Sequence, residues 1–461
     1  MLAHDGVHFF DAFFACSKLG AVFTPLSWRS HATEIEAQLR LVRPEILFFD
    51  DVAPRVDPAS DPIAAIVAYL AGLNGMPEMH SCSGLEQVCA ASGDVHLPDD
   101  PLTCESVTES DVACLLFVDG TTRHPRAAQI SHRQIAWNTL DTHLSDLQGT
   151  DTFLNVFPLF HAAGLFALSL PLLILGGTII QPRRFDPEQV LEIIERERVS
   201  VFAGVPTMFH MLTTTAGWER ADLGSLRFCL SGGAPMPVSL IERYQSEKGV
   251  VFRQGYGKAQ FGPSVFSLPA DDAVRKAGSI GKPAYFVDAR VVDTETGTTA
   301  RTGEVGELVL RGPSVFSGYF GDRQATAAAF DHKGFFRTGD LARIDHDGYF
   351  YIVERLEDVI ISGGENVYPS EVEAALQGHP AVAMCAVIGT PDPKWGAVGV
   401  GFVVLHRDHV AEHGEVTVEA LFDHLGERLA RYKIPRKLHL VDQLPLSEVG
   451  MIRKDLLRQM V

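Results

Sequence analysis

The stretch DPEQVLEIIERERVSVFAGVP, Asp186 to Pro206, places one helix directly before one strand. Its first half alternates apolar and charged residues at helical spacing, which predicts an amphipathic helix that begins near Pro187. Its second half, VSVFAGV, is apolar and rich in valine, which predicts a buried strand. Because this alternation of apolar strands and amphipathic helices continues to about residue 350, we predict a large layered α/β domain.

The pattern changes twice beyond this region. Between Gly278 and Asp340, short strands and turns predict a small β-rich subdomain, residues 278–340. After about residue 355, a helix, two strands and another helix predict a compact α+β unit. We therefore predict an α/β protein with an N-terminal domain of residues 1–354 and a small mobile C-terminal domain of residues 355–461. Since no low-complexity linker separates them, these domains are expected to meet at a tight hinge.

Composition and charge narrow the possible functions. The 461-residue chain has 46% hydrophobic and 21% charged residues, which is typical of a soluble globular enzyme. Its formal net charge of −19 argues against a nucleic-acid partner, because phosphate binding needs a basic surface. The seven cysteines form neither a metal-binding nor a disulfide pattern, which predicts a reducing, cytoplasmic setting. The apolar stretch from Ala162 to Ile180 reaches membrane-spanning length, but its internal Ser169, Pro171 and paired glycines predict a buried helix and strand, with no membrane partner.

Five blocks rich in glycine and polar residues follow one another along the chain. The first, LLFVDGTTRHPRAAQISH (Leu115 to His132), lies after an apolar strand and before a helix, so its glycine and threonines could offer N–H and hydroxyl groups to an anion. Alone, this block could equally be an ordinary loop. The others are LSGGAPM (Leu230 to Met236), QGYGKAQFGP (Gln254 to Pro263), FFRTGDLARID (Phe335 to Asp345) and VERLEDVIISGGENVYPSEVE (Val353 to Glu373). In this order, the five blocks resemble the ANL superfamily of adenylate-forming enzymes, in its acyl-CoA synthetase branch, over nearly the whole chain.

The resemblance implies a ligase that works in two steps. A carboxylate first attacks the α-phosphate of ATP, which gives acyl-AMP and pyrophosphate. The small domain then rotates, and coenzyme A displaces AMP to give acyl-CoA. Glu357 occupies the position about which the small domain turns in this family, where aspartate or lysine is usual.

The AMP-binding residues that the resemblance implies come from three regions. The adenine would contact the SGGAP turn and the GYG segment, and the ribose hydroxyls would meet a carboxylate, whose two oxygens suit a diol. These residues are Ser231, Gly232, Gly233, Ala234, Pro235, Tyr256, Gly257, Asp340 and, nearby, Arg355. Simpler roles stay open for two of them, a packed aromatic for Tyr256 and a turn residue for Asp340.

The resemblance also implies contacts for the acyl group and for coenzyme A. His161 would border the acyl and thiol sites, at a position where amino-acid-activating relatives usually carry aspartate, so an amino-acid substrate is not expected. Gly363 and Gly364 would line the pantetheine tunnel, because only glycine lets the backbone come so close to a narrow ligand. Three further residues would meet the adenine and phosphate of coenzyme A, unless they only form a basic surface turn: Tyr432, Lys433 and Arg436.

Three departures from the family pattern fall on the first step. In the phosphate loop, Asp119 and Arg123 replace small or flexible residues. A carboxylate about 4 Å from a phosphate oxygen would cost roughly 4 kcal/mol at an effective dielectric of about 20. We therefore interpret this loop as degenerate; its residues are Asp119, Gly120, Thr121, Thr122, Arg123 and Arg126.

The other two departures remove a metal ligand and a cation. Gln260 stands where the family has a glutamate that holds Mg²⁺, and Mg²⁺ prefers carboxylate oxygens, so we expect a lost Mg²⁺ site and a weaker dependence on Mg²⁺. Met451, in LPLSEVGMIRKDLLRQM (Leu444 to Met460), stands at the position of the family's adenylation lysine. The loss of one such donor typically costs about 3 to 4 kcal/mol of transition-state stabilisation. Met451 alone could be a laboratory substitution, but the other departures favour a native origin.

The second step needs none of these features, so we hypothesise an acyl-CoA ligase that mainly converts acyl-AMP and coenzyme A into acyl-CoA and AMP. A separate adenylating enzyme would supply the adenylate of a hydrophobic aryl, fatty or polycyclic acid. One alternative is a complete two-step synthetase in which other cations substitute for the missing charges: Arg126, Lys258, Arg453 or Lys454. Another is a pseudoenzyme that binds nucleotide or acyl ligands, although the tunnel glycines argue against it.

Overall fold

The computed structural model describes the chain except for residues 52–60, 85–105, 119–124, 407–413, 415 and 448–450. The chain forms two compact units. The first unit comprises Met1–Ala277, Gly281–Asp288 and Leu310–Phe336, and the second comprises Gly278–Ile280, Ala289–Val309 and Arg337–Val461. The second unit therefore combines strands of the β-rich segment with the C-terminal α+β segment.

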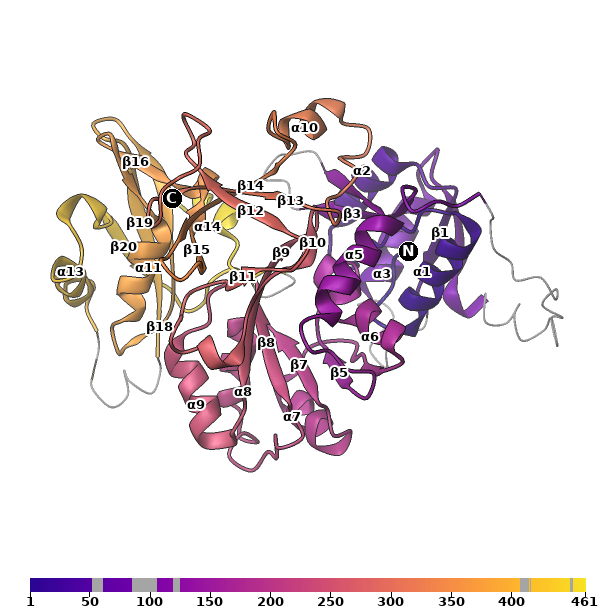
Figure 1. Cartoon of the computed structure of the whole chain (residues 1–461), viewed down its shortest axis with the longest axis horizontal. Coiled ribbons are helices and arrows are strands. Elements are labelled where there is room, and N and C mark those ends of the chain that lie inside the picture. Colours follow the sequence, from indigo (N-terminus) through magenta and orange to yellow (C-terminus); the bar gives the residue numbers. More distant parts are fainter. Residues whose placement is uncertain (52–60, 85–105, 119–124, 407–413, 415, 448–450) are drawn as a thin grey trace. The chain divides into compact units, whose positions relative to one another are not determined.

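A seven-stranded sheet is the largest sheet of the first unit (Figure 1). Its strand order is β11-β10-β9-β8-β7-β5-β6; the neighbours from β6 to β9 run parallel, whereas β10 and β11 each run antiparallel to their neighbours. The strands are β5 (Thr152–Asn155), β6 (Thr178–Ile180), β7 (Val201–Gly204), β8 (Phe228–Gly232), β9 (Phe252–Lys258), β10 (Gly262–Leu268) and β11 (Lys282–Pro283). The parallel strands are connected by helices α6 (Ser169–Leu175), α7 (Pro187–Arg196), α8 (Pro206–Thr213) and α9 (Val238–Lys248).

Local sequence explains why helix α7 begins where it does. The Asp186 side chain accepts a hydrogen bond from the Gln189 N–H at 3.0 Å, which satisfies one of the unpaired donors at the helix start. Pro187 occupies the first helical position, where its missing N–H costs nothing. The helix is followed by strand β7, so the helix and strand predicted from this stretch are confirmed.

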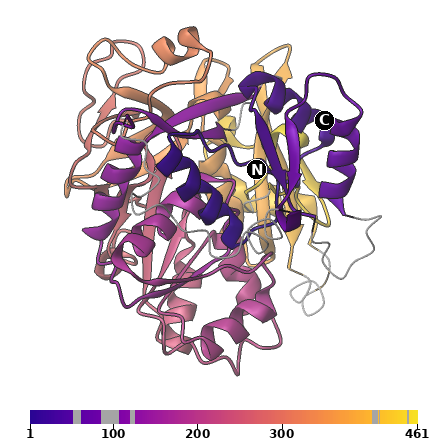
Figure 2. The ribbon, with the colours of Figure 1, turned by 90° about the vertical axis from the view of Figure 1, so that its right-hand side faces the viewer.

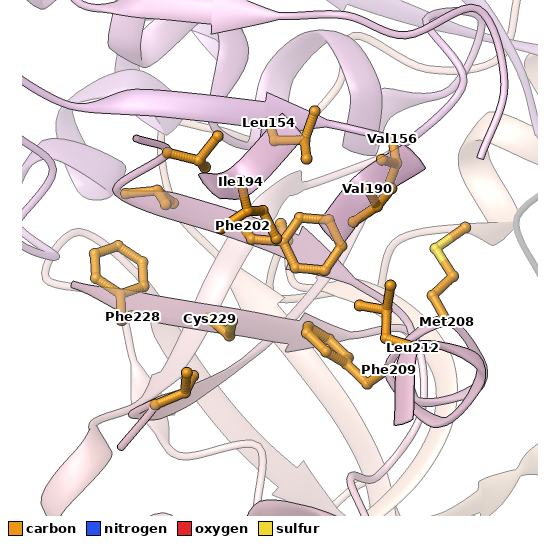
Figure 3. Close-up of a cluster of buried hydrophobic side chains, with 14 of the residues drawn as sticks. Leu154, Val156, Val190, Ile194, Phe202, Met208, Phe209, Leu212, Phe228 and Cys229 are labelled. Atoms are coloured by element: carbon orange, nitrogen blue, oxygen red, sulfur yellow. The ribbon is translucent and has the colours of Figure 1, made fainter. Parts of the chain in front are cut away.

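The apolar faces of α7 and α8 pack against β5, β7 and β8 in one buried cluster (Figure 3). Phe202 of β7 and Phe209 of α8 make an edge-on contact with ring centroids 5.4 Å apart, and Phe209 also contacts Phe252 at 4.9 Å. Aromatic pairs of this kind add about 0.5–1.5 kcal/mol to the stabilisation from area burial. This core holds the strands whose carboxyl ends carry the candidate site.

Two smaller strand pairs and further helices complete the first unit. The parallel pair β1 (Ile46–Phe49) and β2 (Glu78–Ser81) lies in the indigo part of the ribbon with α2 (Ala32–Val42) and α3 (Pro62–Ala71) (Figure 2). These elements share an apolar cluster of their own. The remaining elements are α1 (Val7–Leu19), α5 (His132–His143), α10 (Arg323–Ala328), the π-helix η2 (Ala163–Ala167) and the 3-10 helix η3 (Ala270–Asp272).

One strand of the first unit was not predicted. The block Leu115 to His132 follows an apolar strand and precedes a helix as expected, but it also contains a second strand, so that β3 (Val112–Val118) pairs antiparallel with β4 (Arg126–Ser131) before α5 begins. Strand β4 reads RAAQIS, which has too few apolar and β-branched residues to indicate a strand by itself. Pairing with the apolar β3 decides its conformation, because strand formation depends on neighbours more than on intrinsic preference.

The apolar stretch from Ala162 to Ile180 is divided as predicted. It forms the π-helix η2, the short helix α6 and strand β6. Among the described residues, no helix combines the length and the apolar character needed to cross a membrane.

The second unit contains two sheets. The four-stranded sheet has the order β12-β13-β14-β15, with β12 (Asp288–Val292), β13 (Gly306–Arg311), β14 (Phe336–Ile344) and β15 (Phe350–Arg355). The five-stranded sheet consists of β16 (Ile360–Ser362), β17 (Glu365–Val367), β18 (Val382–Asp392), β19 (Gly396–Leu405) and β20 (Lys437–Leu440). Its helices are α11 (Pro369–Gln377), α13 (Val418–Gly426) and α14 (Lys454–Arg458), with the 3-10 turns η4 (Leu356–Asp358) and η5 (Arg431–Lys433). The predicted order of helix, two strands and helix after residue 355 is confirmed.

Replacing Phe209 by alanine is expected to lower the free energy of unfolding by about 3 to 5 kcal/mol, because a fully buried phenylalanine leaves a cavity that the packed core cannot close. The matched control is Met211→Ala on the same helix, whose side chain is 43% exposed. That change should alter stability by about 0.5 kcal/mol or less. Denaturant unfolding measures both variants, and equal losses would contradict the assigned core.

Candidate active site

The carboxyl ends of β8 and β9 bring two of the predicted blocks together. Ser231 and Gly232 of β8 pair in register with the segment Gln254–Gly255 of the parallel strand β9, which continues into Tyr256. The chain after β8 turns through Gly233, whose φ of 80° favours glycine. Ligands of open α/β sheets bind at such carboxyl ends. The SGGAP turn and the GYG segment therefore share one edge of the sheet.

The side chains at this edge are polar or open to solvent. The Ser231 Oγ is buried and has no hydrogen-bond partner among the described residues. A buried hydroxyl without a partner is unfavourable, so a ligand or water that bonds to it is stabilised. Tyr256 is half-buried and packs edge-on against Phe266, with ring centroids 5.7 Å apart. Gly233, Ala234 and Pro235 are exposed.

Gln260, which stands in place of the expected glutamate, lies in the turn between β9 and β10. Its side-chain amide donates to the Tyr319 hydroxyl at 3.3 Å. The Arg126 guanidinium lies 5.7 Å from the centre of the Tyr319 ring and 4.0 Å from the Asp322 carboxylate. The structure therefore brings Gln260 and Arg126 together around Tyr319. The other predicted phosphate-loop residues, 119–123, lie outside the described residues.

His161 lies in the loop between β5 and the π-helix η2, an element that is rare and often marks a functional site. In this loop the Leu159 N–H donates to Oδ1 of Asp5 at 2.6 Å, and Asp5 is only 5% exposed. Burial raises the pKa of Asp5 to about 6, although the Leu159 hydrogen bond and the charges of Arg29 and His161 oppose the shift. Sequence reasoning missed Asp5, because no motif marks it and its partner lies 154 residues away.

Two predicted residues of the second unit lie opposite each other on β14 and β15. Asp340 pairs in register with Arg355, and Asp340 is buried with its own N–H donating to Thr338 Oγ1 at 3.0 Å. The Arg355 guanidinium lies 3.8 Å from the Glu357 carboxylate. The structure thus places the predicted ribose acceptor, its arginine neighbour and the predicted hinge residue close together.

Gly363 and Gly364 form the turn between β16 and β17, with φ values of 62° and 89°. A Cβ on Gly363 would come within 2.8 Å of the Trp395 ring, and the Gly363 N–H donates to the Trp395 carbonyl at 2.8 Å. The Arg436 guanidinium lies 5.8 Å from the centre of the same ring. Trp395 was not predicted; an exposed tryptophan between a lysine and a glycine is the signal that could have identified it.

Lys433 forms an ion pair with a carboxylate. Its ammonium lies 2.6 and 2.8 Å from the two carboxylate oxygens of Glu371, and this pairing raises the pKa of Lys433 above its usual value. Tyr432 is exposed. Of the three residues predicted to meet coenzyme A, Arg436 lies at the Trp395 ring, whereas Glu371 balances the charge of Lys433.

Met451 lies near the end of the chain and is hydrogen-bonded to Ser447. Its N–H donates to Ser447 Oγ at 3.1 Å, and its carbonyl accepts a hydrogen bond from the Ser447 N–H. Leu446 forms a bridge with Ile452 beside this pair. Both hydrogen bonds use main-chain atoms of Met451, so neither depends on its side chain.

The two cations after Met451 are paired with carboxylates of the second unit. The Arg453 guanidinium contacts both oxygens of Asp455, at 2.8 and 2.6 Å. The Lys454 ammonium lies 2.9 Å from Glu373. Burial opposes the charge of Lys454, but the carboxylates of Glu373 and Glu354 outweigh burial and raise the pKa of Lys454.

The first unit carries an open, largely parallel sheet with a glycine turn after β8, and the second unit carries the Gly363–Gly364 turn. This combination is shared with a solved CoA synthetase that holds an acyl-adenylate. Residues 1–320 match the AMP-binding enzyme family, and residues 371–450 match the AMP-binding enzyme C-terminal domain. The chain belongs to this family, within the acyl-CoA ligases of the ANL superfamily.

The chain is 38% identical to a feruloyl-CoA synthase from an Amycolatopsis species over 452 residues. The aligned region covers 98% of this chain and 86% of the relative. It is 34% identical to the indoleacetate–CoA ligase of Aromatoleum aromaticum, over 100% of this chain and 87% of the relative. The solved o-succinylbenzoate CoA synthetase of Bacillus subtilis, in complex with its acyl-adenylate intermediate, is 29% identical with a TM-score of 0.81, over 99% of this chain and 86% of that one. These comparisons confirm the predicted family and fold class.

The Asp5→Asn variant is expected to change how stability depends on pH. Because the pKa of Asp5 is raised from 3.8 to about 6, the folded state holds this proton more tightly than the unfolded state does. The wild type should therefore lose about 3 kcal/mol of unfolding free energy as the pH rises from 4 to 7, a loss that Asp5→Asn should not show. Urea unfolding at several pH values measures the difference, and parallel curves for the two proteins would refute it.

Proposed function

We propose that this protein is a ligase for hydrophobic, aryl-bearing carboxylates that acts mainly in the second half-reaction, the conversion of acyl-AMP and coenzyme A into acyl-CoA and AMP. The observation that carries the proposal is Met451, an uncharged side chain at the position of the family's adenylation lysine. A methionine cannot donate to the charge that develops between a carboxylate and the α-phosphate.

The neighbouring cations are poor substitutes for that lysine. To reach a phosphate, Lys454 would have to leave Glu373 and Glu354. Removing one partner from a largely buried ion pair typically costs about 3 to 5 kcal/mol. A preorganised donor to the transition state contributes about 3 to 4 kcal/mol. The two effects nearly cancel, so recruitment of Lys454 brings little net catalysis.

Phosphate handling is weakened in the first unit as well. Gln260 is neutral where Mg²⁺ would need a carboxylate, and its amide is bonded to Tyr319. Arg126, one of the possible substitute cations, lies over the same ring and near Asp322. In this proposal, pyrophosphate departure has weaker support from a metal ion and from Arg126, whereas departure of AMP in the second step needs neither.

The parts that the second step requires are retained. The SGGAP turn and Tyr256 would hold the adenine, Asp340 the ribose, and the Gly363–Gly364 turn with Trp395 and Arg436 would receive coenzyme A. Similarity to enzymes named for feruloyl-CoA and indoleacetate supports an acid with an aromatic ring on a short side chain. In this proposal a separate adenylating enzyme of the cytoplasm supplies the acyl-AMP.

A complete two-step synthetase is the second candidate, because the similar proteins are named as CoA synthases and ligases. The two candidates are separated by supplying synthetic feruloyl-AMP or indoleacetyl-AMP with coenzyme A, in parallel with ATP–pyrophosphate exchange on the free acids. Rapid thioester formation with exchange slower by a factor of about a hundred or more supports the proposal. Exchange as fast as thioester formation would establish the complete synthetase instead.

Met451→Lys is expected to raise the rate of pyrophosphate exchange by a factor of about 10² to 10³, because it restores the missing donor to the transition state. Thioester formation from acyl-AMP should stay within a few-fold of the wild type. The control is Leu456→Lys, which adds the same charge at an exposed position of α14 and should leave exchange unchanged. A wild type that already matches Met451→Lys in exchange would disprove the role given to this position.

A further inference from the structure

The loop that carries His161 is fixed by buried polar groups. Within its own segment, the Asn155 amide donates to the Gly164 carbonyl at 3.0 Å, and Ser169 Oγ donates to the same carbonyl at 2.6 Å. Gly164 itself comes so close to the Pro158 carbonyl oxygen that a Cβ would lie 2.2 Å from it. These contacts fold the segment on itself, but they do not attach it to a distant part of the chain.

Asp5 ties the part of the segment just before His161 to a distant part of the chain, whereas the η2 part is also held by Asn138 and Phe13. Its carboxylate accepts the Leu159 N–H at 2.6 Å, and Leu159 is two residues before His161. Asp5 precedes helix α1, so this one hydrogen bond ties the His161 loop to the N-terminal part of the first unit. Hydrogen bonds to a carboxylate are shorter and about twice as strong as those between neutral groups, so the bond is well suited to fixing a loop.

The use of a carboxyl group at this place is unfavourable for stability. Burial disfavours its charged form, as the raised pKa of Asp5 indicates. An asparagine would offer the same acceptor oxygen without a buried charge. A group that weakens the fold where a neutral one would fit is typical of functional sites, and here the carboxylate also interacts electrostatically with His161 and Arg29.

We infer that Asp5 is a positioning residue of the acyl site: it fixes the main chain at Leu159 and thereby sets the place of His161 against the acyl group. The inference rests on the proposed function, in which His161 borders the acyl and thiol sites. Asp5 acts on the acid portion of the ligand through this loop. The AMP portion, which the SGGAP turn would hold, does not depend on it.

The test uses the full-length protein with Asp5→Ala, Asp5→Asn and a matched control, Asp141→Asn. Asp141 is also a buried carboxyl of the first unit, 3% exposed, and burial raises its pKa as well. It accepts the Phe286 N–H at 3.2 Å, whereas Asp5 accepts an N–H of the His161 loop. Asp141→Asn therefore measures the effect of altering a buried carboxyl whose main-chain hydrogen bonds go to another segment.

Calorimetric binding of ferulate, of indoleacetate and of AMP gives the first measurement. Asp5→Ala should weaken acid binding about tenfold, as expected for the loss of one charge-assisted hydrogen bond, and leave AMP binding unchanged. Asp5→Asn should restore most of the affinity, because it retains an acceptor. Asp141→Asn should change neither affinity. An equal loss of acid and AMP binding in Asp5→Ala, or the same loss in Asp141→Asn, overturns the inference.

A double-mutant cycle with His161→Ala gives the second measurement. If Asp5 acts through His161, Asp5→Ala should have little further effect on acid binding in the His161→Ala background, whereas additive losses overturn the inference. Neither measurement requires turnover. A wild type that fails to convert acyl-AMP would therefore refute the proposed function, while selective and coupled loss of acid binding would still support the role of Asp5.

Discussion

The parallel register of β7, β8 and β9 is the constraint on which the candidate site depends. Gly204 pairs with Ser231, and Ser231 pairs with Gln254, so the end of β7, the SGGAP turn and the GYG segment of β9 lie at one edge of the sheet. A slip of one residue in β8 would turn every side chain of that strand to the opposite face. The aromatic core around Phe209 opposes such a slip, because its rings interlock with side chains of all three strands.

Charge is distributed so that basic side chains near the candidate sites already have acidic partners. The chain has 58 aspartates and glutamates but only 39 lysines and arginines, so a cation readily finds a carboxylate. Lys433 with Glu371 and Lys454 with Glu373 are examples in the second unit. A phosphate must compete with these partners for the cation. Recruiting Lys433 or Lys454 to a phosphate therefore costs more than the sequence alone suggests.

The sequence predicted helices and strands correctly where hydrophobic periodicity was strong. It predicted the motif blocks of the candidate site where a turn requires glycine. Helix α7, strand β7 and the order of elements after residue 355 followed from pattern alone. Strand β4 did not, because pairing with β3 decides its conformation. Asp5 could not be identified, since its partner is a main-chain N–H whose position only the tertiary structure sets. The pairing of Lys454 with Glu373 was hidden for the same reason.

The contacts at Met451 have an evolutionary consequence. The hydrogen bonds between Met451 and Ser447 use main-chain atoms of residue 451, so they can form with a different side chain at this position. The Gly363 turn lacks this freedom, because any larger side chain there collides with Trp395. Under the proposed function, the residue at position 451 can therefore vary while the glycine turn at Gly363 stays fixed by steric constraint.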